Sequence, residues 1–364
     1  MENKPKVISG MRPTGRIHLG NYWGALKNWI DIQDKYDCAF FVADWHALTT
    51  SSEDTASINS NSNEMVADWL AAGLDPEKCI IFRQSDVPQI AEMSLLLGMI
   101  TPLGWLLRNP TYKEQLVQLY SKKYAGQEHN TTHETGKLAQ ALADTAEVHD
   151  EKELAALSEM SSYGFLGYPV LMATDILANG GDLVPVGQDQ LAHLEITRDI
   201  ARRFADFYGK GILKEPKPLL AAQPKVPGTD GRKMSKSYGN GIELMEEPAS
   251  LEKKVMGMFT DPGKKRANDK GNPDGCVVFS FHKLYNPDCA AREQECRAGS
   301  LGCVACKRHL HGLMKPWFEQ FAQKRAELAK HPETVRTILD EGGRRARERA
   351  EIILDSVRTA MKMR

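Results

Sequence analysis

The feature that most constrains the fold is the alternation of short apolar runs with helical patterns. Strand-length apolar runs occur at 6–9, 38–43, 79–82 and 182–186. Helical spacing of apolar residues follows at 21–30, at 65–74 and at about 190–204. Strands that are continuously apolar are buried on both faces, as in parallel sheets covered by helices. We therefore predict an α/β protein with a doubly wound parallel sheet.

The pattern changes after Pro224, where a glycine-rich loop leads into mostly helical sequence. We place a domain boundary near Gly241, which separates residues 1–240 from a mostly helical domain of residues 241–364. A polar stretch at about 120–159 is interpreted as a surface insertion in the first domain.

Charge and hydropathy exclude some classes of protein. The net charge of −1 gives no overall attraction to nucleic acid, so any RNA contact must come from local basic patches. Residues 342–364 hold seven Arg or Lys against three Asp or Glu, and we interpret them as a solvated helix face. The most apolar stretch, 93–107, is too short and too interrupted to span a membrane, and we expect a buried or subunit-interface segment. No export signal is apparent, so we expect a cytoplasmic location.

The turn after the first strand carries the first motif that suggests chemistry. It reads PTGRIHLGN over residues 13–21. Gly15 and Gly20 allow backbone to approach a purine or a phosphate closely. We expect a helix from Asn21, whose free N–H groups and positive dipole end favour anionic oxygen. His18 can donate a hydrogen bond to a phosphoryl oxygen as charge builds there.

The second motif is the loop GTDGRKMSKS at 228–237. Lys233 and Lys236 flank a Met-Ser pair, and neighbouring glycines give the loop freedom to move. Such a cationic arm can close on a polyphosphate and neutralise a leaving pyrophosphate.

Together, the two motifs resemble the HIGH and KMSKS signatures of the class I aminoacyl-tRNA synthetases. The first is HLGN here, with Asn21 in place of the second histidine, and the second is intact. Within that class, the strings YPVLMATDILA at 168–178 and VPVGQDQ at 184–190 are similar to those of bacterial tryptophanyl-tRNA synthetases. The resemblance implies a Rossmann-like catalytic domain, a C-terminal helical anticodon-binding domain, a homodimer and tRNA(Trp) as partner.

The resemblance also implies roles for individual residues in binding L-tryptophan. Asp175 would accept the indole N–H, Met172 and His46 would shape the pocket, and Tyr168 and Gln190 would hold the ammonium group. The chemistry agrees with this assignment. A buried acceptor left unpaired by tyrosine or phenylalanine discriminates against them by a factor of order 10⁴.

The ATP site implied by the resemblance draws on both motifs. It would contain Arg12, Pro13, Thr14, Gly20, Asn21, Gly187, Gln188, Asp189, Val226, Lys233, Met234, Ser235, Lys236 and Ser237. The tryptophan carboxylate would attack the α-phosphate of ATP, and the 3′-terminal ribose of tRNA would then take the acyl group. His18, Lys233 and Lys236 would stabilise charge, with Mg²⁺ shielding the phosphates.

Five of the seven cysteines fall within a stretch of 31 residues, which in a cytosolic chain favours a metal site over disulfides. Cys296, Cys303 and Cys306 follow the pattern C-x6-C-x2-C. The segment resembles a subset of bacterial tryptophanyl enzymes with a [4Fe–4S] cluster, which implies Cys276 as the first ligand. The gap of 19 residues after Cys276 is shorter than in that pattern, and Cys289 is a rival fourth ligand. Zinc is the alternative metal, since both take four thiolates.

Two other functions stay open at this point. A tyrosyl enzyme would share the fold and the nucleotide motifs, but the strings at 168–178 and 184–190 argue against it. A catalytically silent relative that binds RNA or senses redox state would be expected to lack a loop lysine or a pocket residue, and none is missing.

Overall fold

The computed structural model describes residues 4–112, 162–187, 191–220 and 226–363. Its centre is a parallel sheet of five strands in the order β3-β2-β1-β4-β5. The strands are β1 (Lys6–Met11), β2 (Asp37–Val42), β3 (Cys79–Arg83), β4 (Leu183–Val186) and β5 (Lys217–Leu220). The chain adds β2 and β3 on one side of β1 and then β4 and β5 on the other. The prediction of a doubly wound parallel sheet is confirmed, and the order reverses between β1 and β4.

Both faces of the sheet are buried, for the reason that the apolar runs suggested. In β2, Cys38 and Phe40 point into one hydrophobic core, and Ala39 and Phe41 point into the other. The helices that precede β4 are α1 (Leu19–Asn21), α2 (Lys27–Ile32), α3 (Asp44–Ser51), α4 (Thr55–Ala72), α5 (Pro88–Ile100), α6 (Leu103–Leu107) and α10 (Tyr163–Ala178). The first core takes side chains from α2 and α4, and the second takes them from α5, α10 and α11 (Leu191–Tyr208). Short turns η1 (Tyr22–Leu26) and η2 (Gln84–Asp86) extend α1 and β3.

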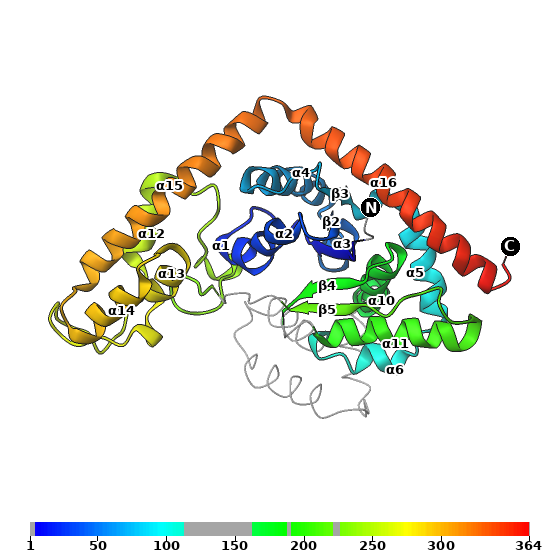
Figure 1. Cartoon of the computed structure of the whole chain (residues 1–364), viewed down its shortest axis with the longest axis horizontal. Helices are drawn as coiled ribbons and strands as arrows, with labels where there is room; N and C mark the ends of the chain where they lie inside the picture. The colour runs from blue at the N-terminus through cyan, green and yellow to red at the C-terminus, as the bar shows by residue number, and fades with distance from the viewer. Residues whose placement is uncertain (1–3, 113–161, 188–190, 221–225, 364) are drawn as a thin grey trace.

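The last third of the described chain is helical. It contains η4 (Lys236–Tyr238), α12 (Pro248–Gly257), η5 (Pro273–Gly275), α13 (Val277–Tyr285), α14 (Cys289–Ala298), α15 (Cys303–Ala329) and α16 (Pro332–Ala360). The long helices α15 and α16 meet at an angle above α4 and frame the sheet (Figure 1). The boundary near Gly241 and the insertion at about 120–159 stay predictions, and most of the insertion lies outside the described residues.

The interpretation of residues 342–364 as a solvated face is wrong for one side of α16, which is buried against the sheet. The helix packs against β3, so closely that a Cβ on Gly342 would meet the carbonyl oxygen of Ile81 at 1.8 Å. Its buried positions recur every three or four residues, and Ala346, Ala350 and Leu354 are fully buried.

The apolar stretch 93–107 forms the end of α5 and all of α6. One face is buried in the second core, whereas Leu95, Met99, Leu103 and Leu107 are exposed. No helix among the described residues is long and apolar enough to cross a membrane.

Candidate active site

A cavity of about 420 Å³ opens where the strand order reverses, at the carboxyl ends of β1 and β4. Parallel sheets bind ligands at such a switch point because the loops on either side diverge there. The lining includes predicted site residues from four segments: Arg12, His46, Tyr168, Met172, Asp175 and Gly187. Tyr168, Met172 and Asp175 share one face of α10 because they are spaced four and three residues apart.

Asp175 is the buried acidic group of this cavity, with 2% of its surface exposed. Its Oδ2 lies 3.0 Å from Nε2 of His46, and its Oδ1 accepts a hydrogen bond of 2.8 Å from Nε2 of Gln84. Burial raises the pKa of this carboxyl, and the contacts with His46 and Gln84 oppose that rise. The result is an acceptor held in a fixed orientation against an apolar cavity.

Tyr168 belongs to a second buried network. Its hydroxyl lies 3.3 Å from Nδ2 of Asn109 and 3.4 Å from Nε2 of His193. Asn109 also contacts Nδ1 of His193 at 3.2 Å. These contacts hold the phenol ring at the cavity wall, with its hydroxyl directed into a polar corner.

The first motif forms the start of a helix slightly earlier than expected. The helix begins at Leu19, with His18 as its N-cap, whereas we predicted a start at Asn21. Nδ1 of His18 accepts from the N–H of Asn21 at 3.3 Å, and Oδ1 of Asn21 accepts from the N–H of His18 at 3.2 Å. This reciprocal capping box gives Asn21 a structural role at the substituted position.

The surroundings of His18 fix its protonation state. Burial, and then the charge of Lys236, lower its pKa to about 4. The ring is therefore neutral at pH 7, and because Nδ1 accepts a hydrogen bond, the ring proton is on Nε2. The remaining N–H is a donor that can reach a phosphoryl oxygen without carrying a full charge.

The second motif contacts the first across more than 200 residues of sequence. Nζ of Lys236 donates to the carbonyl oxygen of Thr14 at 2.8 Å, and burial lowers the pKa of this ammonium group. The buried side chain of Met234 packs against Gly20, with its sulfur 3.3 Å from the Gly20 nitrogen. Lys233 is exposed. The structure thus brings both motifs to one place.

Asn240 organises the loop of the second motif from inside. Its Nδ2 donates to Oδ1 of Asp230 at 2.8 Å and to the carbonyl of Lys233 at 3.1 Å, and its Oδ1 accepts from the N–H of Ser235 at 2.9 Å. The side chain fits because residue 228 is glycine, where a Cβ would meet Nδ2 of Asn240 at 2.2 Å.

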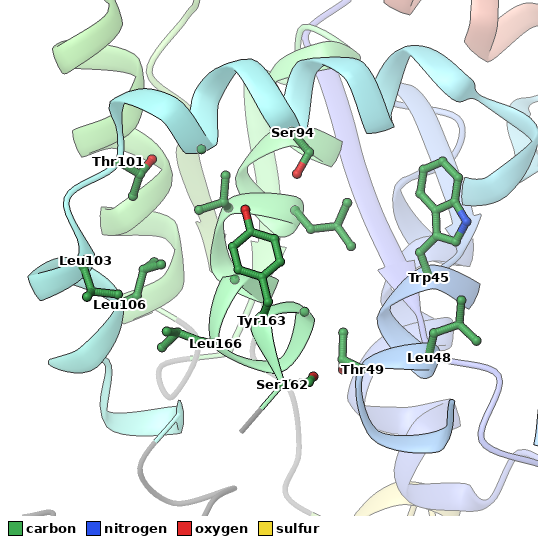
Figure 2. A pocket seen from close by; sticks show the side chains of 15 residues that line it. Trp45, Leu48, Thr49, Ser94, Thr101, Leu103, Leu106, Ser162, Tyr163 and Leu166 are labelled. Carbon is green, nitrogen blue, oxygen red and sulfur yellow. The ribbon is translucent and has the colours of Figure 1, made fainter. Parts of the chain in front are cut away.

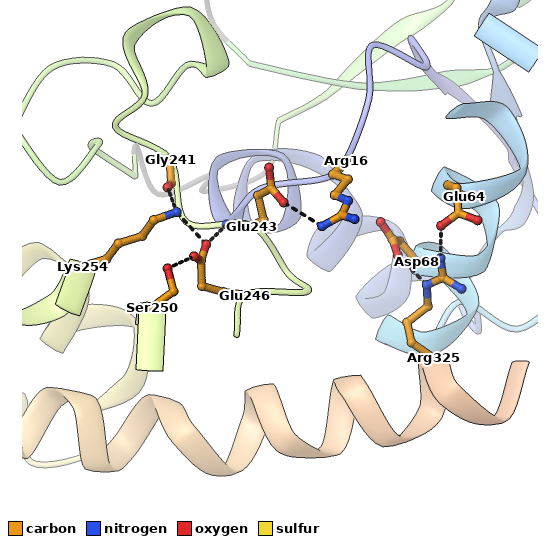
Figure 3. Close-up of polar contacts among 9 residues, drawn as sticks. All are labelled: Arg16, Glu64, Asp68, Gly241, Glu243, Glu246, Ser250, Lys254 and Arg325. Carbon is orange, nitrogen blue, oxygen red and sulfur yellow. Dashed lines mark hydrogen bonds and ion pairs between the residues drawn. The ribbon is translucent and has the colours of Figure 1, made fainter. Parts of the chain in front are cut away.

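Ion pairs surround the first motif (Figure 3). Arg325 of α15 donates from Nε to Oδ1 of Asp68 at 2.7 Å, and Asp68 also accepts from the backbone N–H of Ile17. Arg16 lies 3.5 Å from Glu243, but both side chains are exposed and the pair contributes little. The buried contact of Asp68 therefore ties the first motif to α4 and to the C-terminal helices.

Arg12 is a largely buried cation whose partner is a neutral hydroxyl. Its Nη2 donates to Oγ1 of Thr50, and its Nε is buried with no hydrogen-bond partner among the described residues. Burial lowers the pKa of the guanidinium. A buried cation of this kind at a cavity wall favours an anionic ligand.

Some predicted residues cannot be placed. Gln188, Asp189 and Gln190 lie outside the described residues, as does the side chain of Ser237. Val226 is buried, and Pro13 precedes the Thr14 carbonyl that receives Lys236. The sequence analysis missed Gln84, Asn109 and His193. A signal for Gln84 was present, because a polar residue directly after a buried parallel strand lies at the ligand edge of the sheet.

Comparison with known proteins agrees with this geometry. The model of the tRNA synthetases class I (W and Y) matches residues 1–319. The chain belongs to this family. Tryptophan–tRNA ligase of Aquifex aeolicus is 45% identical over 98% of this chain and 100% of the relative, and that of Thermotoga maritima is 39% identical over 98% and 99%.

A solved structure supports the same family at the level of fold. The tryptophanyl-tRNA synthetase from Campylobacter jejuni complexed with ADP and tryptophan has a TM-score of 0.78. It is 30% identical and covers 98% of this chain and 99% of its own. The prediction of a Rossmann-like sheet followed by helices is confirmed for this synthetase.

The clustered cysteines of the synthetase lie at the ends of three helices. Cys276 is the N-cap of α13, Cys296 is in the last turn of α14, and Cys303 and Cys306 are in the first turn of α15. Burial raises the pKa of Cys306 to about 12, and the charges of Cys276, Cys296 and Cys303 contribute to the rise.

Cys289 stands apart from the other four cysteines. Burial raises its pKa, and the charged groups that act on it are Lys283 and Glu293 rather than thiols. Within the described chain, no group of three or more His, Cys, Asp or Glu residues is arranged to hold a metal ion. The charges of Cys276, Cys296 and Cys303 act on Cys306, and those of Cys276 and Cys303 act on Cys296.

A second cavity, of about 410 Å³, lies beside the exposed apolar side chains at the end of α5 and on α6 (Figure 2). Trp45 and Leu48 of α3, Leu103 of α6 and Tyr163 at the start of α10 border it. Tyr163 is 84% exposed.

Proposed function

We propose that this synthetase is a tryptophan–tRNA ligase, which activates L-tryptophan with ATP and transfers it to tRNA(Trp). The observation that carries the proposal is the buried Asp175 carboxylate at an apolar cavity, next to two nucleotide motifs in contact. The relatives named above, which match over nearly the whole chain, bear the same name. Because tRNA charging accompanies translation, we also propose a cytoplasmic location.

The cavity suits an indole better than a phenol. Asp175 would accept the indole N–H, Met172 and His46 would shape the pocket, and Tyr168 with Gln190 would hold the ammonium group. Phenylalanine has no polar donor in its ring. The phenolic O–H of tyrosine can donate, but it projects from the tip of a single ring rather than from the edge of an indole, where the N–H would meet Asp175. Leaving that buried acceptor unpaired costs far more than a poor fit of shape.

The nucleotide would lie along the two motifs. Arg12, Pro13, Thr14, Gly20 and Asn21 would contact it. So would Gly187, Gln188, Asp189 and Val226, and the loop residues Lys233, Met234, Ser235, Lys236 and Ser237. Mg²⁺ would shield the phosphates during reaction.

The chemistry needs positioning and charge stabilisation rather than a protein nucleophile. The tryptophan carboxylate oxygen attacks the α-phosphorus, and the bond to the bridging oxygen of pyrophosphate breaks. His18 would donate from Nε2 to the phosphoryl oxygen, and Lys233 and Lys236 would neutralise charge on the leaving pyrophosphate. The ribose hydroxyl of tRNA then displaces AMP from the aminoacyl carbonyl.

We assign these steps to residues 1–240 and anticodon binding to the helical residues 241–364. The contact of Arg325 on α15 with Asp68, which holds the Ile17 N–H, would connect the two regions.

We also propose that Cys276, Cys296, Cys303 and Cys306 hold a [4Fe–4S] cluster, with zinc as the alternative. Their spacing, their places at neighbouring helix ends and their electrostatic interaction support one shared site. Thiolates of a cluster each bind a different iron, so their sulfurs stand farther apart than around one zinc ion. When bound, the group would cross-link α13, α14 and α15.

Metal analysis of anaerobically purified protein tests the cysteine site. About four iron and four labile sulfide per chain, lost in Cys276→Ser and kept in Cys289→Ser, would support the cluster. One zinc ion per chain would support the zinc alternative instead. The absence of both iron and zinc would reject the metal site.

We further propose that the synthetase is a homodimer joined through the exposed apolar face of α5, α6 and the start of α10. Leu95, Met99, Leu103 and Tyr163 are exposed on this face. Large apolar side chains that are exposed together on neighbouring elements often mark a protein–protein interface.

Pyrophosphate exchange with ATP tests the main proposal. We expect exchange with tryptophan, little with tyrosine, and its loss in Asp175→Ala. A matched control is Asp199→Ala, which removes an exposed carboxylate on α11. Exchange driven by tyrosine would indicate the tyrosyl enzyme, and no exchange with either amino acid would indicate a silent relative.

A further inference from the structure

Gln84 makes three buried contacts that the activity as proposed does not use. The residue follows β3 directly, and none of its surface is exposed. Its Oε1 accepts from the backbone N–H groups of Trp45 at 3.1 Å and of His46 at 3.4 Å. Its Nε2 donates to Oδ1 of Asp175 at 2.8 Å.

The direction of the Gln84 amide is fixed by the helix start beside it. Trp45 and His46 are in the first turn of α3, where backbone N–H groups have no partner within the helix. The N–H of Trp45 also donates to Oδ1 of Asp44 at 3.1 Å, and the N–H of His46 donates to Oε1 of Gln84. Both N–H groups face this end of the amide, so Oε1 faces α3 and the NH₂ group faces Asp175. A flipped amide would direct its NH₂ group at two N–H donors.

The consequence for Asp175 is a restriction on what it can do. An NH₂ group only donates, so Oδ1 of Asp175 can act only as an acceptor toward Gln84. Oδ2 is held by His46. Burial raises the pKa of this carboxyl, and the hydrogen bonds with Gln84 and His46 act against that rise by favouring a carboxylate that accepts.

We propose that Gln84 is the positioning residue that keeps Asp175 an acceptor and so sets the preference for an aromatic side chain with an N–H group. This inference rests on the proposed function, in which Asp175 meets the indole. Gln84 acts through Asp175 and needs no contact with tryptophan.

The test compares tryptophan with β-(3-benzothienyl)alanine, which has the same ring shape but sulfur in place of the N–H. The measurement is the ratio of kcat/KM for the two amino acids in pyrophosphate exchange. We expect the wild type to prefer tryptophan by about 100-fold or more, because the analogue offers no N–H to the further lone pairs of the buried Asp175 carboxylate. A general loss of folding lowers both values and leaves the ratio unchanged.

Two variants alter Gln84 while keeping its size. In Gln84→Glu one oxygen still caps α3 and the other faces Asp175, so the two carboxyls must share a proton. In Gln84→Met the donor is lost. We expect both to lower kcat/KM for tryptophan by about 10- to 100-fold and to change that for the analogue by less than about threefold. Gln33→Glu is the matched control: Gln33 is also buried and bonds Gly73 and Asp75 away from the cavity, so its ratio should stay wild-type.

A swap keeps the test decisive if either single variant folds poorly. In Asp175→Asn the carbonyl oxygen fits the donor of Gln84, so the NH₂ group would take the place of Oδ2 beside His46. The side chain would then have a donor in place of the second acceptor, and we expect the preference for tryptophan to be lost. The double variant combines Asp175→Asn with Gln84→Glu. The carboxylate at residue 84 then accepts from the amide NH₂ group at residue 175, and the carbonyl oxygen of that amide becomes free to accept from the ligand. We expect the double variant to recover part of the preference.

The outcomes separate the two ideas. A preference that persists in both Gln84 variants, or a double variant no better than Asp175→Asn, overturns the role of Gln84 and leaves the proposed function intact. A wild type that exchanges with tryptophan but treats the analogue equally rejects the contact between Asp175 and indole, and the role of Gln84 with it. No exchange with tryptophan rejects the proposed function itself.

Discussion

At the scale of the residue, His18 illustrates how one hydrogen bond determines what a side chain can do. Its Nδ1 is occupied by the N–H of Asn21, and its pKa is lowered to about 4, mainly by burial. The imidazole therefore works as a neutral donor through Nε2. Asn21, which departs from the usual signature, supports this arrangement by accepting from the His18 backbone.

The lowered pKa of His18 makes stability depend on pH. The pKa of an unfolded histidine is near 6.5. Between about pH 6.5 and pH 4, His18 therefore binds a proton in the unfolded chain but not in the folded chain. The free energy of unfolding should fall as pH falls through this window. Urea unfolding across the window should show a shallower fall for His18→Asn, which keeps a good N-cap. Identical pH dependence in the two proteins would contradict the assignment.

Asn240 should matter for rate rather than for tryptophan binding. Asn240→Ala removes its contacts with Asp230, Lys233 and Ser235, so the loop loses its fixed form. We expect kcat for pyrophosphate exchange to fall by about 10- to 100-fold with the KM for tryptophan nearly unchanged. Because Asn240 acts through the loop lysines, adding Asn240→Ala to Lys233→Ala should lower kcat only slightly further. If the two substitutions lowered kcat by fully additive free energies, Asn240 would not act through Lys233.

Residues with a recognisable motif could be predicted from the sequence, and their supporting partners could not. His18, Lys236 and Asp175 lie in sequence motifs whose residue types indicate their chemistry. Asn109 and His193 are ordinary polar residues in the sequence. His193 meets Tyr168 because α10 and α11 pack side by side, and Asn109 meets it because α6, which Asn109 follows, also packs on α10. Which polar residues meet inside a core depends on helix packing, which a single sequence does not specify.

At the scale of the element, strands were predictable when they were buried on both faces. The runs expected at 6–9, 38–43, 79–82 and 182–186 became β1 to β4 within one or two residues. β5 was missed because it is an edge strand of four residues with Pro218 inside it and two exposed positions.

The close packing of α16 on β3 predicts an unusual cost for a small substitution. In Gly342→Ala the new methyl group would lie 1.8 Å from the Ile81 carbonyl oxygen, so the helix must move away from the sheet. We expect the free energy of unfolding to fall by about 3 kcal/mol in chemical denaturation.

Gly312→Ala is the matched control for this substitution. It places the same methyl group in the middle of α15, where nothing lies within 4 Å. Removing a helical glycine there should stabilise the protein by about 0.5–1 kcal/mol. Equal effects at the two positions would contradict the packing argument.

At the scale of the whole molecule, the exposed apolar face predicts an oligomeric state that can be measured. Met99→Glu places a charge on the face, where Met99 is 72% exposed, and should convert a dimer to a monomer in sedimentation velocity. Ile352→Glu alters an equally exposed apolar residue on α16 and should leave the dimer intact. A monomeric wild type would reject the proposed interface.

The position of α16 also has a consequence for how the chain is made. β3 is an edge of the sheet, and the helix that covers it, α16, follows all five described strands in the sequence. Because synthesis runs from the N-terminus, every strand leaves the ribosome long before α16 does. The nascent sheet must therefore wait with an uncovered edge, which is a surface open to pairing with other chains. Synthesis of α16, rather than completion of the sheet, is the event that closes this fold.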